Sequence, residues 1–378
     1  MQLLSSIAVL LAIIYSISLI YLLFGLLRSS KGMNTHKHFL SVVVPVHNEA
    51  GKIQDCMKSL AVQDYPGIKY EVIIVDDCSA DNTSEIVQRF CEKNPNFRYL
   101  RLDNDERFVP KKSALLKALD NARGEIIVST EADCLHSAGW LSSLNSYFDL
   151  NTGLVAGHVE YRNVKSWSQG IDALDYFSQR VLGASFIQSG TVYTCSAANM
   201  AYRKDIYEKS REVFKNLKVR PADDNFLLNF TYRKTDYDIA SADSKDSVVK
   251  TDGASNLIHF LNQRFRWSAY GDKPGLAMQL FFIPAMLLYI FLWILSLASI
   301  LNPSNLVLLI LPISIKLIAD FLFLFRASGY YRSRHLMKYF LPSWIVNLIL
   351  VPLIVIKGNL STFEWKGKKY TKTAEVKA

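Results

Sequence analysis

Two carboxylates follow a short strand-forming run about a third of the way along the chain. Residues 125–130 read Glu-Ile-Ile-Val-Ser-Thr after Gly124 and lead directly to Glu131 and Asp133. Because side chains two apart on an extended backbone share a face, the pair can offer oxygen ligands to a hard cation such as Mg²⁺ or Mn²⁺. Such ions usually keep coordination positions for substrate phosphates, which predicts a site for a phosphate-bearing ligand. The alternative is an exposed loop with two unrelated acids.

Polar residues also follow two earlier apolar runs. Residues 39–45 form a continuous apolar run typical of a buried parallel strand, and His47 and Glu49 come shortly after it. Residues 71–75 form a second run, which ends in the aspartates at 76–77. Ligands of parallel α/β sheets lie beyond the carboxyl ends of the strands. We therefore expect these residues and the later acidic pair to converge on one crevice.

Helix-forming and strand-forming segments alternate through this part of the chain. The patterns predict a short strand over residues 97–102 and helices over residues 49–63, 82–91 and 111–122. This alternation predicts an α/β layer structure with a largely parallel sheet. The sequence has no Gly-x-Gly-x-x-Gly and no Gly-x-x-x-x-Gly-Lys-Ser/Thr pattern, which argues against a dinucleotide-binding fold and a P-loop.

Long apolar runs lie at both ends of the 378-residue chain. The run over residues 3–27 carries no charge and lacks a basic n-region and a cleavage site, so residues 1–27 are interpreted as a retained transmembrane anchor. Later apolar runs cover residues 276–301, 306–325 and 339–356. The resulting domain prediction is an anchor, a polar domain over 37–273, a membrane region of two or three spans over 276–357, and a basic tail over 358–378.

The formal charge of +9 is better explained by a membrane than by nucleic acid. Many basic residues flank the apolar runs, as the positive-inside rule expects of cytoplasmic loops: Arg28, Lys31, Lys37, Arg326, Arg332, Arg334, Lys338, Lys357, Lys366, Lys368 and Lys369. The chain is therefore predicted to be an integral protein of the plasma or inner membrane, with its polar domain in the cytoplasm. The five cysteines are odd in number and lack paired metal spacing, which indicates reduced thiols.

Two features of the apolar runs leave alternatives open. If residues 339–356 cross the membrane fully, the basic tail lies outside; with Pro342 and Pro352 near its ends, the run is alternatively re-entrant or interfacial. Lys316 and Asp320 lie four apart within another run and can pair on one helix face. That pair is either functional or a self-neutralising contact inside a helix bundle.

Several separate pieces between residues 39 and 267 form a recognisable series. The pieces are Val-Val-Val-Pro-Val-His-Asn-Glu-Ala at 42–50, Val-Ile-Ile-Val-Asp-Asp-Cys-Ser at 72–79, Lys-Lys-Ser-Ala-Leu-Leu-Lys-Ala-Leu at 111–119, Glu-Ala-Asp at 131–133, Ala-Asp-Asp-Asn-Phe-Leu-Leu at 222–228 and Gln-Arg-Phe-Arg-Trp at 263–267. In this order, the pieces resemble the family 2 glycosyltransferases. The last piece matches the Gln-x-x-Arg-Trp motif of the membrane-bound branch, which includes cellulose, chitin and hyaluronan synthases and ceramide glucosyltransferase. The chain departs from the family in having Glu131 and Asp223 where aspartate and glutamate are usual.

The resemblance implies a GT-A fold, an α/β nucleotide-diphospho-sugar transferase domain, flanked here by N-terminal and C-terminal transmembrane helices. It also implies roles for individual residues. Donor contacts are implied for Pro45, His47, Glu49, Asp77, Lys112 and Arg266. Mg²⁺ or Mn²⁺ binding is implied for Asp133 and Glu131. The general base would be Asp224, with Asp223 beside it, and the acceptor or product side would include Gln263, Arg264 and Trp267.

These motifs also have purely structural interpretations. Asp223 and Asp224 can simply charge the start of a helix over residues 225–232. Residues 263–267 can form a basic, aromatic juxtamembrane helix. The strand-like residues 194–202 resemble the family's small-residue acceptor segment, but they can equally form a plain buried strand.

The sequence as a whole predicts a membrane-integral inverting glycosyltransferase. Its expected ligands are a nucleotide sugar, most simply UDP-linked, and a lipid or lipid-linked acceptor, because two or three C-terminal spans look small for a translocating channel. The first alternative is a processive polysaccharide synthase, with or without an accessory subunit. The second is a catalytically inactive membrane scaffold, suggested by the altered acids at 131 and 223.

Overall fold

The computed structural model describes residues 1–28, 31–102, 112–216, 223–269, 275–360, 363–365 and 368–370. The chain divides into two units, each of which is treated by itself. The sheet unit comprises residues 29–163 and 192–253, and the helical unit comprises residues 1–28, 164–191 and 254–378. The helical segments 164–191 and 254–269, which fall inside the predicted 37–273 domain, thus cluster with the apolar ends of the chain.

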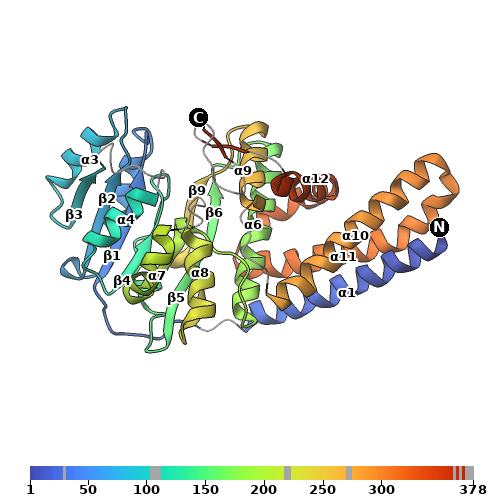
Figure 1. Ribbon diagram of the computed structural model, residues 1–378, viewed down its shortest axis with the longest axis horizontal. Coiled ribbons are helices and arrows are strands. Elements are labelled where there is room, and N and C mark those ends of the chain that lie inside the picture. The colour runs from blue at the N-terminus through green and yellow to red at the C-terminus, as the bar shows by residue number, and fades with distance from the viewer. Residues whose placement is uncertain are drawn as a thin grey trace. The chain divides into compact units, whose positions relative to one another are not determined.

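The sheet unit is built on a seven-stranded sheet with the strand order β3-β2-β1-β4-β7-β5-β8 (Figure 1). These strands are β1 (Leu40–Val46), β2 (Tyr70–Asp76), β3 (Phe97–Arg101), β4 (Ile126–Ser129), β5 (Thr152–Gly157), β7 (Met200–Arg203) and β8 (Asp238–Ala242). Strands β1 to β4 are parallel, whereas β7 runs antiparallel to both β4 and β5. The predicted α/β fold is confirmed, with the sheet mixed at β7.

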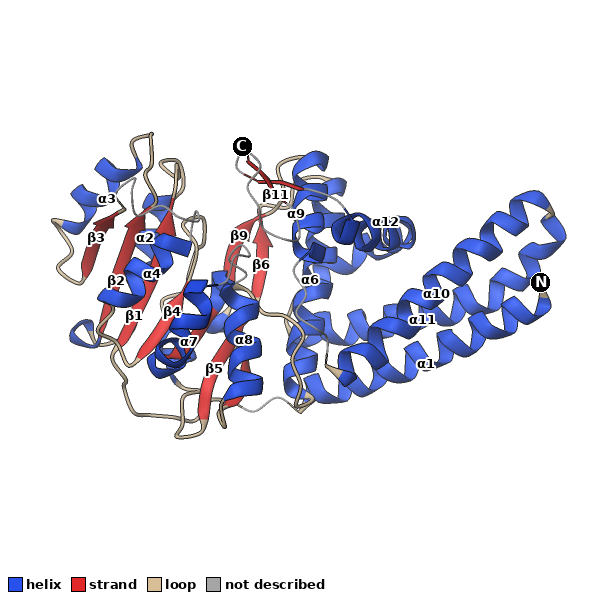
Figure 2. Cartoon of the chain, viewed as in Figure 1, coloured by secondary structure: helices blue, strands red, loops and turns tan. Residues whose placement is uncertain are grey.

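Helices cover the sheet, as Figure 2 shows in blue against the red strands. They are α2 (Ile53–Ala61), α3 (Thr83–Cys91), α4 (Lys112–Asn121), α5 (Trp140–Asn145), α7 (Lys204–Asn216) and α8 (Asp223–Lys234), with the 3₁₀ turns η1 (Gly67–Lys69), η3 (Ala197–Asn199) and η4 (Lys245–Ser247). Strands β6 (Val159–Arg162) and β9 (Val249–Asp252) form a separate parallel pair. The apolar runs become central strands because both their faces are covered: Val42, Ile73 and Val128 are fully buried, each contributing roughly 1.5–3 kcal/mol.

Two predicted elements differ from the observed ones. The helix predicted over 49–63 begins only at Ile53, because residues 47–50 form a turn in which Asn48 has a φ of 55°. Asparagine tolerates this left-handed conformation better than most residues. The strand predicted over 194–202 begins only at Met200, since the preceding residues Ala197–Asn199 form a 3₁₀ turn.

The helical unit contains α1 (Gln2–Leu27), α6 (Trp167–Gln188), α9 (Leu257–Ala269), α10 (Leu276–Leu301), α11 (Leu306–Tyr330) and α12 (Phe340–Leu360), with η5 (Pro303–Asn305), η6 (Arg334–Tyr339) and the hairpin β10 (Phe363–Trp365) and β11 (Lys368–Tyr370). Helices α1, α10 and α11 run side by side (Figure 1). Among the described residues, four helical segments are long and apolar enough to cross a membrane: Gln2–Leu27, Leu276–Leu301, Pro303–Tyr330 and Arg334–Lys357.

The last apolar run forms one continuous helix. Helix α12 extends from Phe340 to Leu360, with Pro352 inside it. The C-terminal region therefore has three segments of spanning length, the upper value predicted. Whether α12 crosses the membrane or lies at its surface stays a prediction.

The predicted pairing of Lys316 with Asp320 is confirmed. The Lys316 Nζ lies 2.5 Å from Asp320 Oδ2, and both side chains are largely buried in the helical unit. The hydroxyl of Tyr15 donates to Asp320 Oδ1 at 2.6 Å, and the indole N–H of Trp344 donates to Oδ2 at 2.8 Å. This cluster connects α1, α11 and α12, so α1 is an integrated part of the helix bundle.

Candidate active site

The loops after β1 and β2 are joined by hydrogen bonds. The Nδ1 of His47 lies 2.7 Å from the Asp77 carbonyl oxygen and donates to it. The backbone N–H of Asn48 donates to Ser79 Oγ at 3.0 Å, and that of Glu49 donates to Thr83 Oγ1 at 2.9 Å. The structure thus brings together, at the carboxyl edge of the sheet, the residues after β1 and β2 that are predicted to bind the sugar donor.

The adjacent aspartates at the end of β2 have different surroundings. Asp76 accepts from the backbone N–H of Ser79 at 2.8 Å and from the hydroxyl of Tyr99 at 2.9 Å, and it also accepts from Ser84. Burial opposes the ionisation of Asp76, but these hydrogen bonds hold its pKa below the usual value. Asp76 therefore fixes the loop, and the buried Asp77 beside it is the residue for which a donor contact is predicted.

Glu131 and Asp133 lie in a turn directly after β4, not on the strand itself. Burial raises the pKa of Asp133, and the carboxylates of Glu131 and Glu49 raise it further, whereas Lys52 lowers it. Three acids therefore lie close enough to repel one another. A divalent cation would relieve this repulsion, and carboxylate oxygens are the donors that Mg²⁺ and Mn²⁺ prefer, so the residues fit the predicted metal site.

A group of charged residues next to Asp133 was not predicted from the sequence. The Nζ of Lys52 lies 3.9 Å from Asp133 Oδ2 and 3.4 Å from Asp252 Oδ2. The guanidinium of Arg162 donates two hydrogen bonds to Asp252, from Nε to Oδ1 at 2.8 Å and from Nη2 to Oδ2 at 3.3 Å. Lys52 could have been found from its position three residues after Glu49, but Arg162 and Asp252 meet only because β6 pairs with β9.

The reversed strand β7 brings a second segment to the acidic turn. Met200, the first residue of β7, pairs with Ser129, the last residue of β4. The segment before β7 therefore lies beside the residues that follow β4, and the Thr130 hydroxyl donates to the Ala198 carbonyl at 3.0 Å. Because β7 runs antiparallel to β4, the small-residue segment before β7 lies beside the acidic turn that holds Glu131 and Asp133.

The predicted general base contacts this same segment. Asp224 Oδ2 accepts from the backbone N–H of Ala197 at 3.1 Å, and its Oδ1 accepts from the N–H of Asn225 at 2.8 Å. Both Asp223 and Asp224 lie in the first turn of α8, where acids are favoured by the helix dipole. Asp223 is buried, while Asp224 is partly accessible, so a base that must reach a substrate is better placed at Asp224.

Two further residues of the sheet unit are predicted to contact the sugar donor. Pro45 lies near the end of β1. Lys112 begins the described part of α4, and its Nζ donates to the Lys215 carbonyl at 3.1 Å. Burial lowers the pKa of Lys112.

The residues of the Gln-x-x-Arg-Trp motif belong to the helical unit, on α9. The guanidinium of Arg264 is buried and donates to Asp172 at 2.6 Å, to Asp175 at 2.7 Å and to the side-chain oxygen of Gln263 at 2.7 Å. It also lies 4.6 Å from the ring centroid of Trp267. These contacts give Arg264 a clear structural role in joining α9 to α6.

The rest of the motif follows the same helix. Trp267 packs against Tyr176 of α6, with the ring centroids 5.7 Å apart. Arg266 is partly buried two residues after Arg264. The contributions of Arg266, Gln263 and Trp267 to a substrate site stay predictions.

The mixed α/β sheet and its acid-lined carboxyl edge agree with a glycosyltransferase, and the comparison with known families supports this class. Residues 41–211 match the family model described as glycosyl transferase family 2. These residues are therefore a glycosyl transferase family 2 domain, and the chain carries the GT-A fold.

Curated relatives match at low identity. The chain is 28% identical over 171 residues to glycosyltransferase AglE of Haloferax volcanii, covering 45% of this chain and 54% of the relative. It is 24% identical over 239 residues to an N-acetylglucosaminyltransferase of Rhizobium meliloti, covering 61% of this chain and 54% of that protein. The chain thus spans about half the length of these two relatives.

One solved structure extends the likeness in fold over nearly the whole chain. It is the mannosyltransferase PcManGT from Pyrobaculum calidifontis in complex with GDP-mannose and Mn²⁺, with a TM-score of 0.56 and 21% identity over 92% of this chain and 99% of that one. At this identity the likeness concerns the fold alone.

Proposed function

We propose that the protein transfers a sugar from a nucleotide donor to a lipid or lipid-linked acceptor. The observation that carries this proposal is the placement of Asp224 beside the 195–199 segment, which in turn contacts the turn holding Glu131 and Asp133. A metal-binding acid pair and a separate accessible carboxylate are the two groups that a metal-assisted single displacement needs.

The acidic turn would hold Mg²⁺ or Mn²⁺ through Asp133 and Glu131. When bound, the cation supplies electrostatic stabilisation of the charge that develops on the leaving diphosphate. Asp224 would accept the proton of the attacking acceptor hydroxyl, and Asp223 would support the start of α8. Displacement in one step predicts inversion at the anomeric carbon.

Donor binding is proposed for the residues at the carboxyl edge of the sheet and for one arginine of the motif. Asp77 would hydrogen-bond the base, His47 would pack near it, and Pro45, Glu49 and Lys112 would complete this side. Arg266 has a planar guanidinium suited to bidentate binding of a phosphate. Gln263 and Trp267 are proposed for the acceptor side, and Arg264 for positioning the motif.

The identity of the donor is proposed from chemistry and from the names of relatives. Several relatives are named for N-acetylglucosamine, among them the Rhizobium enzyme, a poly(ribitol-phosphate) β-N-acetylglucosaminyltransferase and a poly-β-1,6-N-acetyl-D-glucosamine synthase. UDP-N-acetylglucosamine is therefore the first donor to test, and GDP-mannose the second because of the mannosyltransferase structure. The four segments of spanning length favour an acceptor within the membrane.

The test is nucleoside diphosphate release by detergent-purified protein. The assay would compare UDP-sugars and GDP-mannose, with Mg²⁺ or Mn²⁺, with and without host lipid extract. Release that needs one donor, the metal, the lipid and Asp224 supports the proposal, with Asp224→Asn as the control. No release above Asp224→Asn from any donor, together with no metal-dependent donor binding, would favour the inactive scaffold.

A processive polysaccharide synthase is the second candidate, because one relative is named as a poly-β-1,6-N-acetyl-D-glucosamine synthase. The length of the product separates the two. One added sugar per acceptor supports the lipid transferase, whereas a ladder or polymer supports the synthase.

A further inference from the structure

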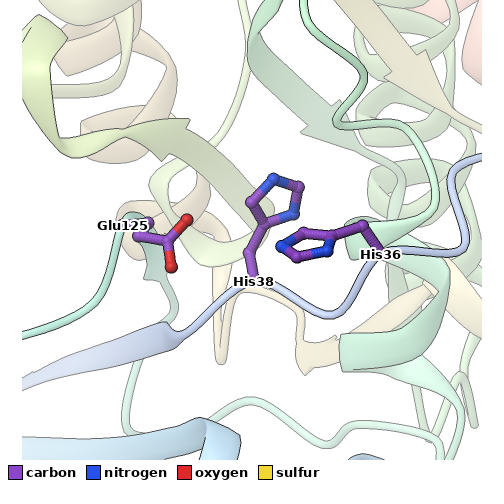
Figure 3. A group of neighbouring side chains, drawn as sticks. All are labelled: His36, His38 and Glu125. Atoms are coloured by element: carbon purple, nitrogen blue, oxygen red, sulfur yellow. The ribbon is translucent and has the colours of Figure 1, made fainter.

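Two histidines and a glutamate gather at the amino end of the sheet unit. His36 and His38 precede β1, and Glu125 immediately precedes β4 (Figure 3). Each offers one possible ligand atom, and these three atoms lie within 4.8 Å of one another. The acids proposed to bind Mg²⁺ or Mn²⁺, Glu131 and Asp133, follow the opposite, carboxyl end of β4, so this group is a separate feature.

Strand pairing explains why the three residues meet. β1 and β4 are parallel neighbours in a register that places Leu40 opposite Ile126. The N–H of Ile126 donates to the Phe39 carbonyl at 3.3 Å. The residues just before the two strands must therefore lie side by side, although they are far apart in sequence.

The hydrogen bonds of His38 fix which ring nitrogen is available. Its Nδ1 lies 3.0 Å from Asn145 Oδ1, which also accepts from the Tyr65 hydroxyl at 3.1 Å. Because Asn145 Oδ1 is an acceptor, Nδ1 of His38 must carry the proton, and the lone pair is on Nε2. A histidine whose other nitrogen donates to an oxygen is the usual arrangement of a metal ligand.

The segment that carries His36 is also held in place. The backbone N–H of His36 donates to Asn34 Oδ1 at 3.1 Å, and its carbonyl accepts from the Asn145 side chain at 2.7 Å. The rings of His36 and His38 lie edge to face with their centroids 4.8 Å apart. His36 and Glu125 are exposed and His38 is buried, so the group is anchored on one side and open to solvent on the other.

We propose that His36, His38 and Glu125 bind a divalent transition-metal ion, with Zn²⁺ as the representative. Two imidazoles and one carboxylate suit Zn²⁺ and differ from the all-oxygen set that suits Mg²⁺ or Mn²⁺. The bound ion would connect the segment after the first apolar helix to the start of β4. It leaves room for a water ligand, because the exposed side of the group is open.

The experiment measures Zn²⁺ binding by tag-free, full-length protein against a competing chelator. Excess Mg²⁺ keeps the carboxylates of the other site occupied. Substitution by Co²⁺ adds a spectroscopic readout, because its absorption reports tetrahedral coordination with nitrogen and oxygen ligands. Release of nucleoside diphosphate from the sugar donor, with Mg²⁺ present, is measured on the same samples. A failure of the proposed function is thereby distinguished from a failure of this site.

His36→Asn and Glu125→Gln are the test variants, because both residues are exposed and their replacement should leave the fold intact. The exposed His335 provides the control, His335→Asn. We expect one Zn²⁺ per wild-type and control chain, and a loss of affinity of at least about 10-fold in each test variant. Zn²⁺ should also raise the melting temperature of the wild type and of the control variant, but not that of the two test variants. Absence of binding by the wild type, or equal binding by all variants, would overturn the proposal.

Discussion

Buried or partly buried acids occur in both units of the protein, but their partners differ. In the helical unit, Asp172 and Asp175 each accept a hydrogen bond from Arg264, at 2.6 and 2.7 Å. Asp320 of the same unit lies 2.5 Å from Lys316. Each of these acids is paired with a buried cation of the chain itself, and Asp172 and Asp175 share Arg264.

The acids at the edge of the sheet unit have weaker compensation. Asp133 Oδ2 is 3.9 Å from the Nζ of Lys52, and burial, together with two other carboxylates, raises the pKa of Asp133. Asp224 accepts from the backbone N–H groups of Ala197 and Asn225. A charge that is not fully neutralised within the protein remains available to a cation or a substrate proton. The comparison therefore separates acids that hold the fold from acids that can do chemistry.

The largest effect is expected at Asp224. Asp224→Asn keeps the size of the side chain and removes its ability to accept a proton, so the transfer rate should fall by about 10²–10⁴-fold. The melting temperature should change little, because the amide oxygen can still accept the N–H of Ala197. The transfer rate and the melting temperature, measured on the same preparation, check this prediction. A variant that keeps full activity would show that Asp224 is not the general base.

The next largest effect is expected on stability, at Arg264. Arg264→Met leaves Asp172 and Asp175 buried without their cation, which should cost about 3–5 kcal/mol of unfolding free energy. Thermal unfolding in detergent measures the loss, and Arg326→Met, at an exposed position in the same unit, is the control. Replacing both aspartates by asparagine in the Arg264→Met background should restore part of the stability. An equal loss in the control would contradict a specific role for the buried pair.

A buried histidine of the sheet unit should make stability depend on pH. Burial lowers the pKa of His136 to about 3. As the pH falls below the ordinary histidine pKa of about 6.5, the unfolded chain takes up a proton that the folded chain does not. Stability should therefore fall by about 1.4 kcal/mol per pH unit, until the pH approaches the folded pKa.

His136→Gln should remove this part of the pH dependence, because glutamine does not titrate. Denaturant unfolding of both proteins between pH 7 and pH 4 gives the difference, which cancels the contribution of the acids. Parallel stability curves for the two proteins would show that His136 is protonated in the folded state.

The smallest effect is expected at an exposed ion pair. Arg89 and Glu85 pair across one turn of α3 at 2.5 Å, but both side chains are largely exposed. Arg89→Ala should change the unfolding free energy by less than about 0.5 kcal/mol, because water screens such pairs. A loss as large as that of Arg264→Met would show that distance, and not burial, decides which charged pairs hold the fold.

Much of the sheet edge could be predicted because its elements are local. The apolar runs that become β1, β2 and β4 are short, continuous and bounded by polar residues, and Asp77, Glu131 and Asp133 follow them directly. Parallel α/β sheets place such residues at one edge, so the convergence followed from the pattern. The long apolar helices were predicted for a similar reason, since spanning length and absence of charge can be read from a single segment.

The partners of charged residues could not be predicted in this way. Arg264 was assigned to a substrate side from its motif, but nothing in the spacing indicates that two aspartates about 90 residues earlier lie against it. The metal group of His36, His38 and Glu125 was also missed, because it depends on the register of two strands whose sequences are far apart.

By itself, the sequence determined which segments are strands or apolar helices and which acids end the strands, because hydrophobic period and residue type act locally along the chain. Only the tertiary structure decided that β7 runs against its neighbours and brings residues 195–199 and Asp224 to the acidic turn. It also decided which acids receive a buried cation. Both outcomes depend on pairings between distant segments, whose energies arise only when those segments pack together.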